Sequence, residues 1–293
     1  MTDKASTAHR ELWGHPIGLY VLFLTEMWER FSYYGMRAIL VIYMIATATD
    51  PNGPGLGWSD EEALMLYGWY VMLVYLLSIP GGILADRLWG QRKTVMIGAI
   101  TLVAGHGTLA IEETWAFFTG LGLIILGVGM LKPNISTMVG GLYREGDIRR
   151  DKGFSIFYIG INLGSLLATT FVGLIVAEYG WHAGFGMAGI GMLLGLVVYL
   201  RGQKYLTHVG NAPEKVVDPN EVTFGDLFRD LLKSPLHLGI TLVLIAISIS
   251  MGFILTGIDK WGYVALFTFL SLVVGMLMMI YKDLSDQIQK DRF

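Results

Sequence analysis

Cysteine is absent from the 293-residue sequence, and charged residues are scarce, at 15%. The absence of cysteine excludes disulfides, thiolate metal sites and cysteine-based catalysis. Soluble domains carry about 25% charged residues, so the shortage of charge argues against an ordinary soluble domain. The formal net charge of −3 supplies no basic surface, and we therefore expect no nucleic-acid partner.

Common catalytic motifs are missing as well. The sequence has no glycine-rich phosphate-binding loop, no H-E-x-x-H pair and no serine in a nucleophile elbow. These absences weaken every enzymatic interpretation. We expect neither catalysis nor a metal or other cofactor.

Hydrophobic residues dominate instead, at 54% of the chain, with a mean hydropathy of +0.55. Apolar stretches long enough to cross a bilayer predict eight transmembrane helices in an all-α integral membrane protein. Their limits are residues 17–46, 64–85, 94–111, 115–140, 153–177, 183–200, 236–257 and 261–281.

A polar stretch between the sixth and seventh predicted helices divides the chain. We expect a six-helix bundle over residues 1–200 and a cytoplasmic linker with a short amphipathic helix over 201–235. A transmembrane hairpin should follow over 236–293. Within the bundle, the pairs Gly160/Gly164 and Gly191/Gly195 have the spacing of helix-packing surfaces.

The charges of the loops predict the orientation of the chain. Lys and Arg occur in residues 4–10, 87–93, 144–152 and 201–204, whereas Asp and Glu occur in 50–62, at 112–113 and at 178. Basic and acidic loops therefore alternate along the predicted helices. Because cytoplasmic loops carry the excess of Lys and Arg, we expect a multi-pass protein of the cell membrane with both termini in the cytoplasm.

The first predicted helix carries charges that a lipid-facing helix would not tolerate. Each ionised side chain at the bilayer centre costs about 2.5–3.5 kcal/mol on insertion scales. At about 100° per residue, the charged residues share one arc with Tyr33, and Tyr34 lies at its edge. These charged residues are Glu26, Glu29, Arg30 and Arg37. We expect them to point into a wet chamber inside the protein. An ion pair that merely neutralises Glu29 and Arg30 would leave the other two unexplained.

Proton exchange in this helix must involve a carboxyl group, since arginine stays protonated. Glu26 and Glu29 are therefore the candidates, and as neighbours they should titrate as a coupled pair. Lys132, directly before Pro133 in the fourth predicted helix, has two possible placements. Its ammonium could reach the cytoplasmic surface, or it could face the carboxylates of the first helix or a substrate carboxylate.

Asp86 stands at the end of the second predicted helix, among the cations of a loop that runs to Lys93. This placement suggests an ionic latch that differs between conformations. The alternative is an ordinary cytoplasmic turn that only sets orientation.

Several stretches resemble the proton-coupled oligopeptide transporters, a branch of the major facilitator superfamily. Residues 26–37, Glu-Met-Trp-Glu-Arg-Phe-Ser-Tyr-Tyr-Gly-Met-Arg, resemble the first-helix E-x-x-E-R signature. Residues 82–93 are similar to the superfamily's loop between helices two and three. Residues 153–164 look like the fifth-helix signature, and residues 131–136 provide a fourth match. The predicted hairpin resembles the helix pair that many bacterial members insert between two bundles.

The resemblance implies symport of di- and tripeptides with protons, driven into the cytoplasm by the proton gradient. The proton-coupling residues it implies are Glu26, Glu29, Arg30 and Lys132. The peptide-binding residues it implies are Tyr33, Tyr34, Arg37, Tyr75, Lys132 and Asn162. The gating loop it implies contains Gly82, Asp86, Arg87, Gly90 and Arg92.

Members of this family also have a second six-helix bundle, which the 293 residues do not include. We expect this chain to hold the N-terminal half of the machinery and to need a second bundle for transport. Two alternatives stay open. One is a transporter of the same fold for a non-peptide anion such as nitrate, and the other is an inactive half-transporter that acts as an assembly partner.

Overall fold

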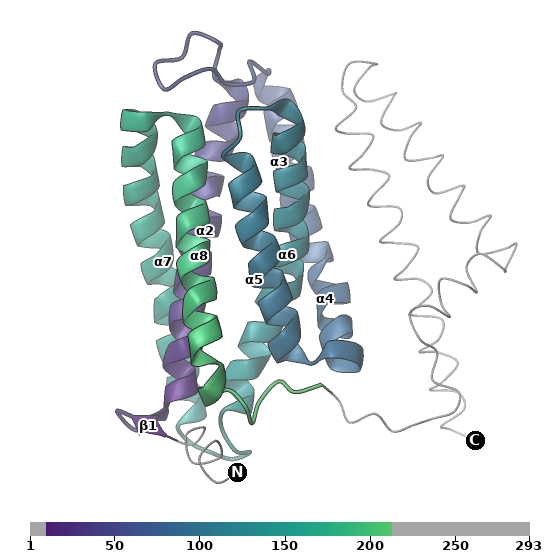
Figure 1. Ribbon diagram of the computed structural model, residues 1–293, viewed down its shortest axis with the longest axis vertical. Helices are drawn as coiled ribbons and strands as arrows, with labels where there is room; N and C mark the ends of the chain where they lie inside the picture. The colour runs from purple at the N-terminus through teal and green to yellow at the C-terminus, as the bar shows by residue number, and fades with distance from the viewer. Residues whose placement is uncertain (1–9, 213–293) are drawn as a thin grey trace, which may run out of the picture. The chain divides into compact units, whose positions relative to one another are not determined.

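The structure, a computed structural model, describes residues 10–212 (Figure 1). The predicted hairpin and most of the predicted linker lie outside the described residues. Two short strands, β1 (Glu11–Leu12) and β2 (His15–Pro16), form an antiparallel hairpin ahead of the helices. The helices are α2 (Ile17–Ile45), α3 (Asp60–Leu76), α4 (Ser78–Leu84), α5 (Gln91–Leu109), α6 (Thr114–Gly141), α7 (Arg150–Tyr179) and α8 (Trp181–Gly202). A π-helical turn, Ala85–Trp89, follows α4, and a 3-10 turn, Gln203–Tyr205, follows α8.

Helices occupy the apolar stretches predicted between residues 17 and 200, with one difference. The stretch predicted over 64–85 consists of α3 and α4, which meet at Leu77. Pro80 explains the break, because a proline ring clashes with the carbonyl four residues earlier in a continuous helix. That residue is Leu76, the last residue of α3.

Four helical segments of the described chain are long and apolar enough to cross a membrane: Asp60–Trp89, Thr114–Gly141, Arg150–Tyr179 and Trp181–Tyr205. α2 has 29 residues, more than the roughly 20 that a span needs, but it carries the four charges noted above. α5 begins with Gln91, Arg92 and Lys93, so it has a polar first turn.

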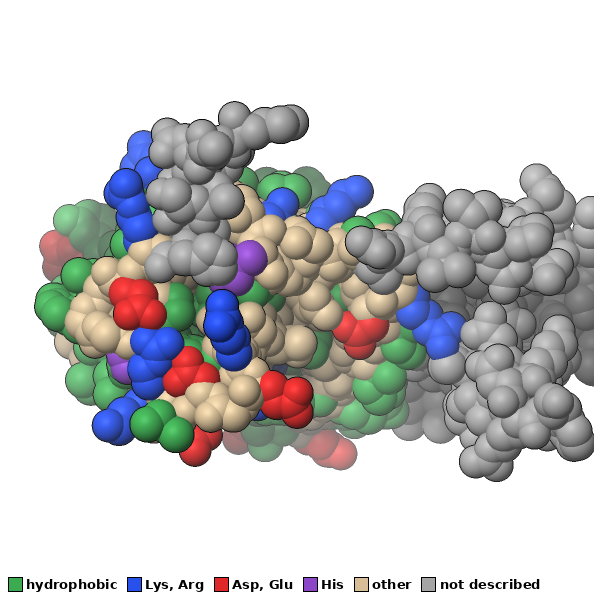
Figure 2. Space-filling view, turned by 90° about the horizontal axis from the view of Figure 1, so that it is seen from below, with side chains coloured by type: hydrophobic (Ala, Val, Ile, Leu, Met, Phe, Trp, Pro, Cys, Tyr) green, Lys and Arg blue, Asp and Glu red, His purple; other side chains and the backbone are tan. Residues whose placement is uncertain are grey.

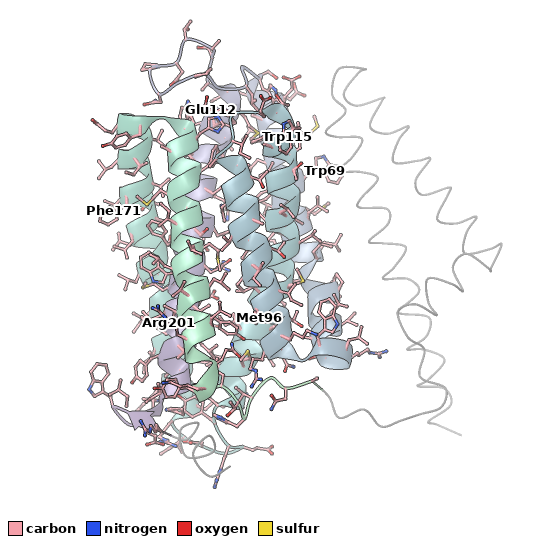
Figure 3. The ribbon with its side chains drawn as sticks, viewed as in Figure 1. Trp69, Met96, Glu112, Trp115, Phe171 and Arg201 are labelled. Carbon is pink, nitrogen blue, oxygen red and sulfur yellow. The ribbon has the colours of Figure 1, made fainter. Side chains whose placement is uncertain are left out.

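The connections between helices gather at two ends of the bundle (Figure 1). The acidic connections lie at the upper end, where Figure 3 labels Glu112. The β-hairpin, the π-helical turn, the α6–α7 connection and the segment after α8 lie at the lower end. Viewed from below, this end shows many Lys and Arg side chains with acidic ones among them (Figure 2). The predicted alternation of loop charge therefore corresponds to two physical ends of the molecule.

α2 is held between α7 and α8 by glycines at the predicted packing positions. A Cβ atom at Gly164 of α7 would lie 2.2 Å from the Met27 carbonyl oxygen, so the two backbones touch. A Cβ atom at Gly191 of α8 would lie 2.4 Å from the Phe31 ring. The prediction that these glycines form helix-packing surfaces is confirmed. The contacts close two sides of α2 around its charged segment.

Candidate functional site

An arginine shared by two carboxylates forms the centre of the site. The Arg30 Nε atom lies 2.9 Å from Glu26 Oε1 and 2.5 Å from Glu29 Oε2. All three side chains come from α2, and each is at most 3% exposed. Within the described chain, both Glu29 oxygens and one Glu26 oxygen accept no hydrogen bond. Buried polar groups are usually hydrogen-bonded, so this cluster is held by charge more than by directed bonds.

Lys132 of α6 supplies a second cation to this cluster. Its charge acts on both Glu26 and Glu29, and its Nζ lies 4.4 Å from the centroid of the Tyr75 ring. The Lys132 side chain is half-buried. Of the two placements left open by the sequence, the structure therefore supports the one that faces the carboxylates.

Arg37 lies two turns beyond Arg30 in a cage of tyrosines. Its guanidinium lies 5.4 Å from the Tyr33 ring centroid, 5.9 Å from that of Tyr34 and 5.3 Å from that of Tyr67. The Nε atom donates a 2.9 Å hydrogen bond to the Tyr67 hydroxyl, and Nη2 donates to the same oxygen. Arg37 is half-buried, and Tyr67 binds its Nε and Nη2 atoms, so the N–H groups on Nη1 are oriented and available to a ligand. A planar guanidinium with free donors is well suited to bind a carboxylate.

Two tyrosines of α3, Tyr67 and Tyr70, were not predicted as site residues. Tyr67 orients Arg37, and the Tyr70 ring stacks on Tyr33 at a centroid distance of 6.5 Å. Tyr70 is 1% exposed, and its hydroxyl makes no hydrogen bond to the described residues. The available signal was weak: two tyrosines three residues apart in an apolar helix, each with a hydroxyl that needs a partner.

Tyr75 and Asn162 are both exposed. Tyr75 is 55% exposed and contacts the site through Lys132. Asn162 is exposed, and its amide donates to the Tyr158 carbonyl in its own helix at 3.1 Å. The structure thus brings Tyr75 to Lys132, whereas the Asn162 side chain bonds within its own helix α7.

The acids do not line a wet chamber, contrary to our expectation from the helical arc. Glu26, Glu29 and Arg30 are closed off from solvent, while Arg37 and Lys132 are half-buried. One reason is the close approach of α7 to α2, where a Cβ at Gly164 would meet both the Met27 carbonyl and the Arg30 side chain. The periodicity of α2 alone does not reveal this contact. The site therefore has two parts, an enclosed cluster of acids with Arg30 and two less buried cations, Arg37 further along α2 and Lys132 on α6.

The predicted gating residues surround the turn between α4 and α5. Gly82 lies in α4, Asp86 and Arg87 are exposed in the π-helical turn, and Gly90 has a φ of +76°. The Asp86 carboxylate accepts a 2.8 Å hydrogen bond from Gln91. The ion pairs found within residues 10–212 do not include Asp86, so no ionic latch is closed there.

Arg92 joins this turn to the segment after α8. Its backbone N–H donates to the Gly210 carbonyl at 2.8 Å, and its own carbonyl accepts from the Tyr199 hydroxyl at 2.8 Å. The chain passes so close to Gly90 that a Cβ there would lie 2.4 Å from the Ala212 nitrogen. The role of Arg92 in this conformation is to tie the turn to the end of the bundle.

Comparison with known proteins places these features in a family. The model of the POT family matches residues 92–224. The uncharacterized transporter YclF of Bacillus subtilis (strain 168) is 40% identical over 291 residues, covering 98% of this chain and 56% of the relative. The di-/tripeptide transporter of Lactococcus lactis subsp. cremoris is 46% identical over 218 residues, covering 74% of this chain and 44% of the relative.

Solved structures give the same result. A crystal structure of the peptide transporter POT with sulfate matches with a TM-score of 0.73 at 41% identity, covering 96% of this chain and 55% of that chain. A POT family transporter in complex with a thioalcohol-conjugated peptide matches with a TM-score of 0.74 at 37% identity, covering 89% of this chain and 51% of that one.

The protein belongs to the POT family of transporters and has their helical, major facilitator type of fold. The family resemblance of the sequence motifs is confirmed. The chain spans about half the length of the curated relatives it matches, at 56% and 44%.

Proposed function

We propose that this chain supplies the N-terminal half of a proton-coupled transporter of di- and tripeptides in the cell membrane. The observation that carries the proposal is the two-part site, in which two half-buried cations, Arg37 and Lys132, accompany the enclosed Glu26–Arg30–Glu29 cluster. The identity to a di-/tripeptide transporter over 74% of the chain supports peptides as the substrate.

Substrate binding would start at the two accessible cations. A peptide carboxylate can accept from the Arg37 N–H groups on Nη1, which Tyr67 leaves free, and can attract the Lys132 ammonium. Lys132 also acts on Glu26 and Glu29, so its charge would be shared between the peptide and the two acids. In the enclosed cluster, Arg30 alone would then neutralise the two carboxylates, so one negative charge would be left uncompensated.

Proton uptake would relieve that imbalance. An uncompensated charge in a low-dielectric interior costs several kcal/mol, and a carboxyl group responds by binding a proton. Either Glu26 or Glu29 can take it, because both share the same guanidinium. Binding of peptide and binding of proton would thereby favour each other, and this linkage is reciprocal.

Movement would require a second bundle that rocks against this one. We propose that the basic end, with its turn at Asp86–Arg92, faces the cytoplasm, together with both chain termini. The contacts of Arg92 with Gly210 and Tyr199 would transmit motion of the turn to the chain that leaves α8.

The direct test is uptake of labelled dialanine into vesicles by a form that carries a complete second bundle. The Glu26→Gln, Glu29→Gln double variant should lose uptake driven by an acid-outside gradient while keeping exchange of peptide between the two sides. Glu145→Gln, which changes an exposed acid in the α6–α7 connection, is the matched control. Undiminished proton-driven uptake by the double variant would refute the proposal.

A non-peptide anion is the second candidate, because Arg37 and Lys132 offer cations that any small anion could use. Dialanine should raise the melting temperature of the full-length form more than nitrate does at equal concentration. The reverse order would favour the anion. The 293-residue chain alone should show no acid-driven dipeptide uptake in vesicles, since a single bundle supplies only half of the cavity wall.

A further inference from the structure

The β-hairpin ahead of α2 exposes its largest apolar side chain instead of burying it. Trp13 is 83% exposed and Leu12 is 42% exposed. Trp13 also has a φ of +51°, and Gly14 follows with +77°. Two successive positive φ angles suit a two-residue hairpin turn, where Asn-Gly or Asp-Gly is the usual sequence. Tryptophan in the first position is therefore held in a sparsely populated backbone region, which strains the turn.

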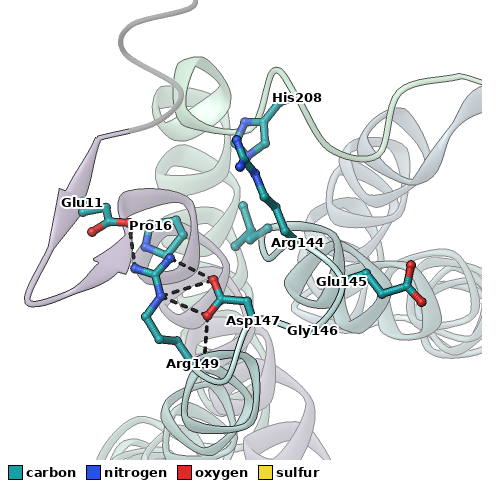
Figure 4. A pocket seen from close by; sticks show the side chains of 9 residues that line it. Glu11, Pro16, Arg144, Glu145, Gly146, Asp147, Arg149 and His208 are labelled. Carbon is teal, nitrogen blue, oxygen red and sulfur yellow. Dashed lines mark hydrogen bonds and ion pairs between the residues drawn. The ribbon is translucent and has the colours of Figure 1, made fainter.

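The strained turn is nevertheless held firmly from three directions. The Arg149 guanidinium donates to the Glu11 carboxylate at 2.8 Å (Figure 4). It also donates to the Gly14 carbonyl at 3.0 Å. The buried His15 ring is hydrogen-bonded to the Tyr143 hydroxyl at 2.8 Å. The Tyr20 hydroxyl donates to the Leu12 carbonyl at 3.0 Å. The fold therefore fixes the hairpin while leaving the Trp13 ring uncovered.

The contact with Tyr20 fixes the position of Trp13 relative to the beginning of α2. The two rings meet edge to face with centroids 5.8 Å apart. Tyr20 belongs to the first turn of α2, and helical side chains tilt toward the N-terminus. The hairpin thus folds back, so that Trp13 lies beside the beginning of a membrane-spanning helix. Leu24, one turn further along the same face of α2, is also exposed.

We propose that this hairpin anchors the bundle in the headgroup layer of the membrane, with Trp13 and Leu12 inserted among lipids. The headgroup layer is about 6 Å thick on each side of a 30 Å hydrocarbon core. Tryptophan and tyrosine prefer this layer because an apolar ring and a polar N–H or O–H are satisfied there together. The charge of Glu11 does not oppose insertion, since Arg149 pairs with it. Insertion of Trp13 would offset the strain of its backbone.

The absence of cysteine from the whole chain makes a clean experiment possible. A nitroxide is attached to Leu12→Cys in the chain reconstituted in vesicles of phosphatidylcholine and phosphatidylglycerol. Its collision rates with oxygen and with a water-soluble nickel chelate then report depth. Glu145→Cys, exposed in the α6–α7 connection at the same end of the molecule, is the aqueous control. Leu194→Cys, exposed in the middle of α8, is the lipid control.

We expect the label at position 12 to collide with the nickel chelate several-fold less often than the label at position 145, and with oxygen more often. Adding Trp13→Ser should raise nickel access at position 12, whereas Trp13→Tyr should preserve the protection. Equal nickel access at positions 12 and 145 would overturn the proposal, and would leave a soluble partner or a second copy of the chain as the occupant. The outcome is independent of what the protein transports.

Discussion

Two arginines of this structure each bind two carboxylates, in opposite surroundings. Arg30 lies between Glu26 and Glu29 inside the bundle, with side chains at most 3% exposed. Arg149 binds Glu11 and Asp147 at the lower end, where its side chain is 40% exposed (Figure 4).

The two clusters also differ in hydrogen bonding. The Arg149 Nε, Nη1 and Nη2 atoms all donate, to Asp147, to Glu11 and to the Gly14 carbonyl. In the Arg30 cluster, two guanidinium nitrogens and three carboxylate oxygens have no hydrogen bond within the described residues. The saturated, solvated cluster is suited to hold two segments together. The enclosed, unsaturated cluster is suited to respond when a proton or another charge arrives.

Removal of the shared arginine should give the largest difference in stability between the two clusters. Arg30→Ala leaves two buried carboxylates with Lys132 as their nearby cation, and breaking a buried pair in this way costs about 3–5 kcal/mol. Thermal unfolding in detergent should show a large drop in melting temperature. Arg149→Ala is the matched control and should lower it far less, because solvent screens the acids that remain. Equal drops would remove the distinction between the two clusters.

The enclosure of the Arg30 cluster depends on backbone contact between α2 and α7. Gly164→Ala would force a Cβ against the Met27 carbonyl, and overpacking of this kind costs about 1–3 kcal/mol. Gly173→Ala in the same helix meets nothing within 4 Å and should be neutral or stabilising. Chemical denaturation of both variants measures the difference. If the two variants are equally stable, close packing does not enclose the acids.

A smaller effect is expected from the tyrosine that orients Arg37 for substrate binding. Tyr67→Phe removes the acceptor of two guanidinium donors, and a hydrogen bond to a charged group contributes about 1.5–3 kcal/mol. Dialanine affinity of a full-length form should fall about tenfold or more by calorimetry, since 1.4 kcal/mol is a factor of ten. Tyr70→Phe, whose hydroxyl makes no hydrogen bond here, should change affinity less. The opposite order would reassign the positioning role to Tyr70.

The smallest effect is expected in the pH response of the Arg149 cluster, through Asp147. Hydrogen bonds from the Arg149 side chain and backbone lower the pKa of Asp147 below its ordinary value. A carboxyl group with a lowered folded-state pKa contributes stability above its unfolded pKa, and loses that contribution as the pH falls. Melting temperatures at acid and neutral pH should therefore converge slightly in Asp147→Asn. A pH response identical to that of the parent chain would show that this group contributes nothing.

Much of the fold could be predicted from the sequence. Apolar stretches predicted the helix positions because a bilayer demands long segments without charge. The alternation of basic and acidic loops predicted which loops lie at the same end of the bundle. The E-x-x-E-R signature identified the charged arc of α2, since helical periodicity places residues 26, 29, 30, 33 and 37 together. The family followed from the same motifs.

The different burial of the acids and the cations of the site could not be predicted in this way. Periodicity gives the angle of a side chain around its own helix, but not what stands opposite. Glu26 and Arg37 share an arc, yet the first is enclosed and the second is half-buried. The break in the second predicted helix was readable from Pro80, whereas the contact between Tyr67 and Arg37 spans 30 residues and leaves no local trace.

The sequence by itself determined that this chain is a membrane-spanning helical protein with acids and bases on one face of its first long helix. Hydrophobic length and helical period are local properties, and they are sufficient for that conclusion. Only the tertiary structure decided how deeply the Arg30 cluster is enclosed, which cations remain accessible and how the hairpin that carries Trp13 is held. Those features depend on contacts between different segments, such as Gly164 with Met27 and Arg149 with Glu11, each more than a hundred residues apart.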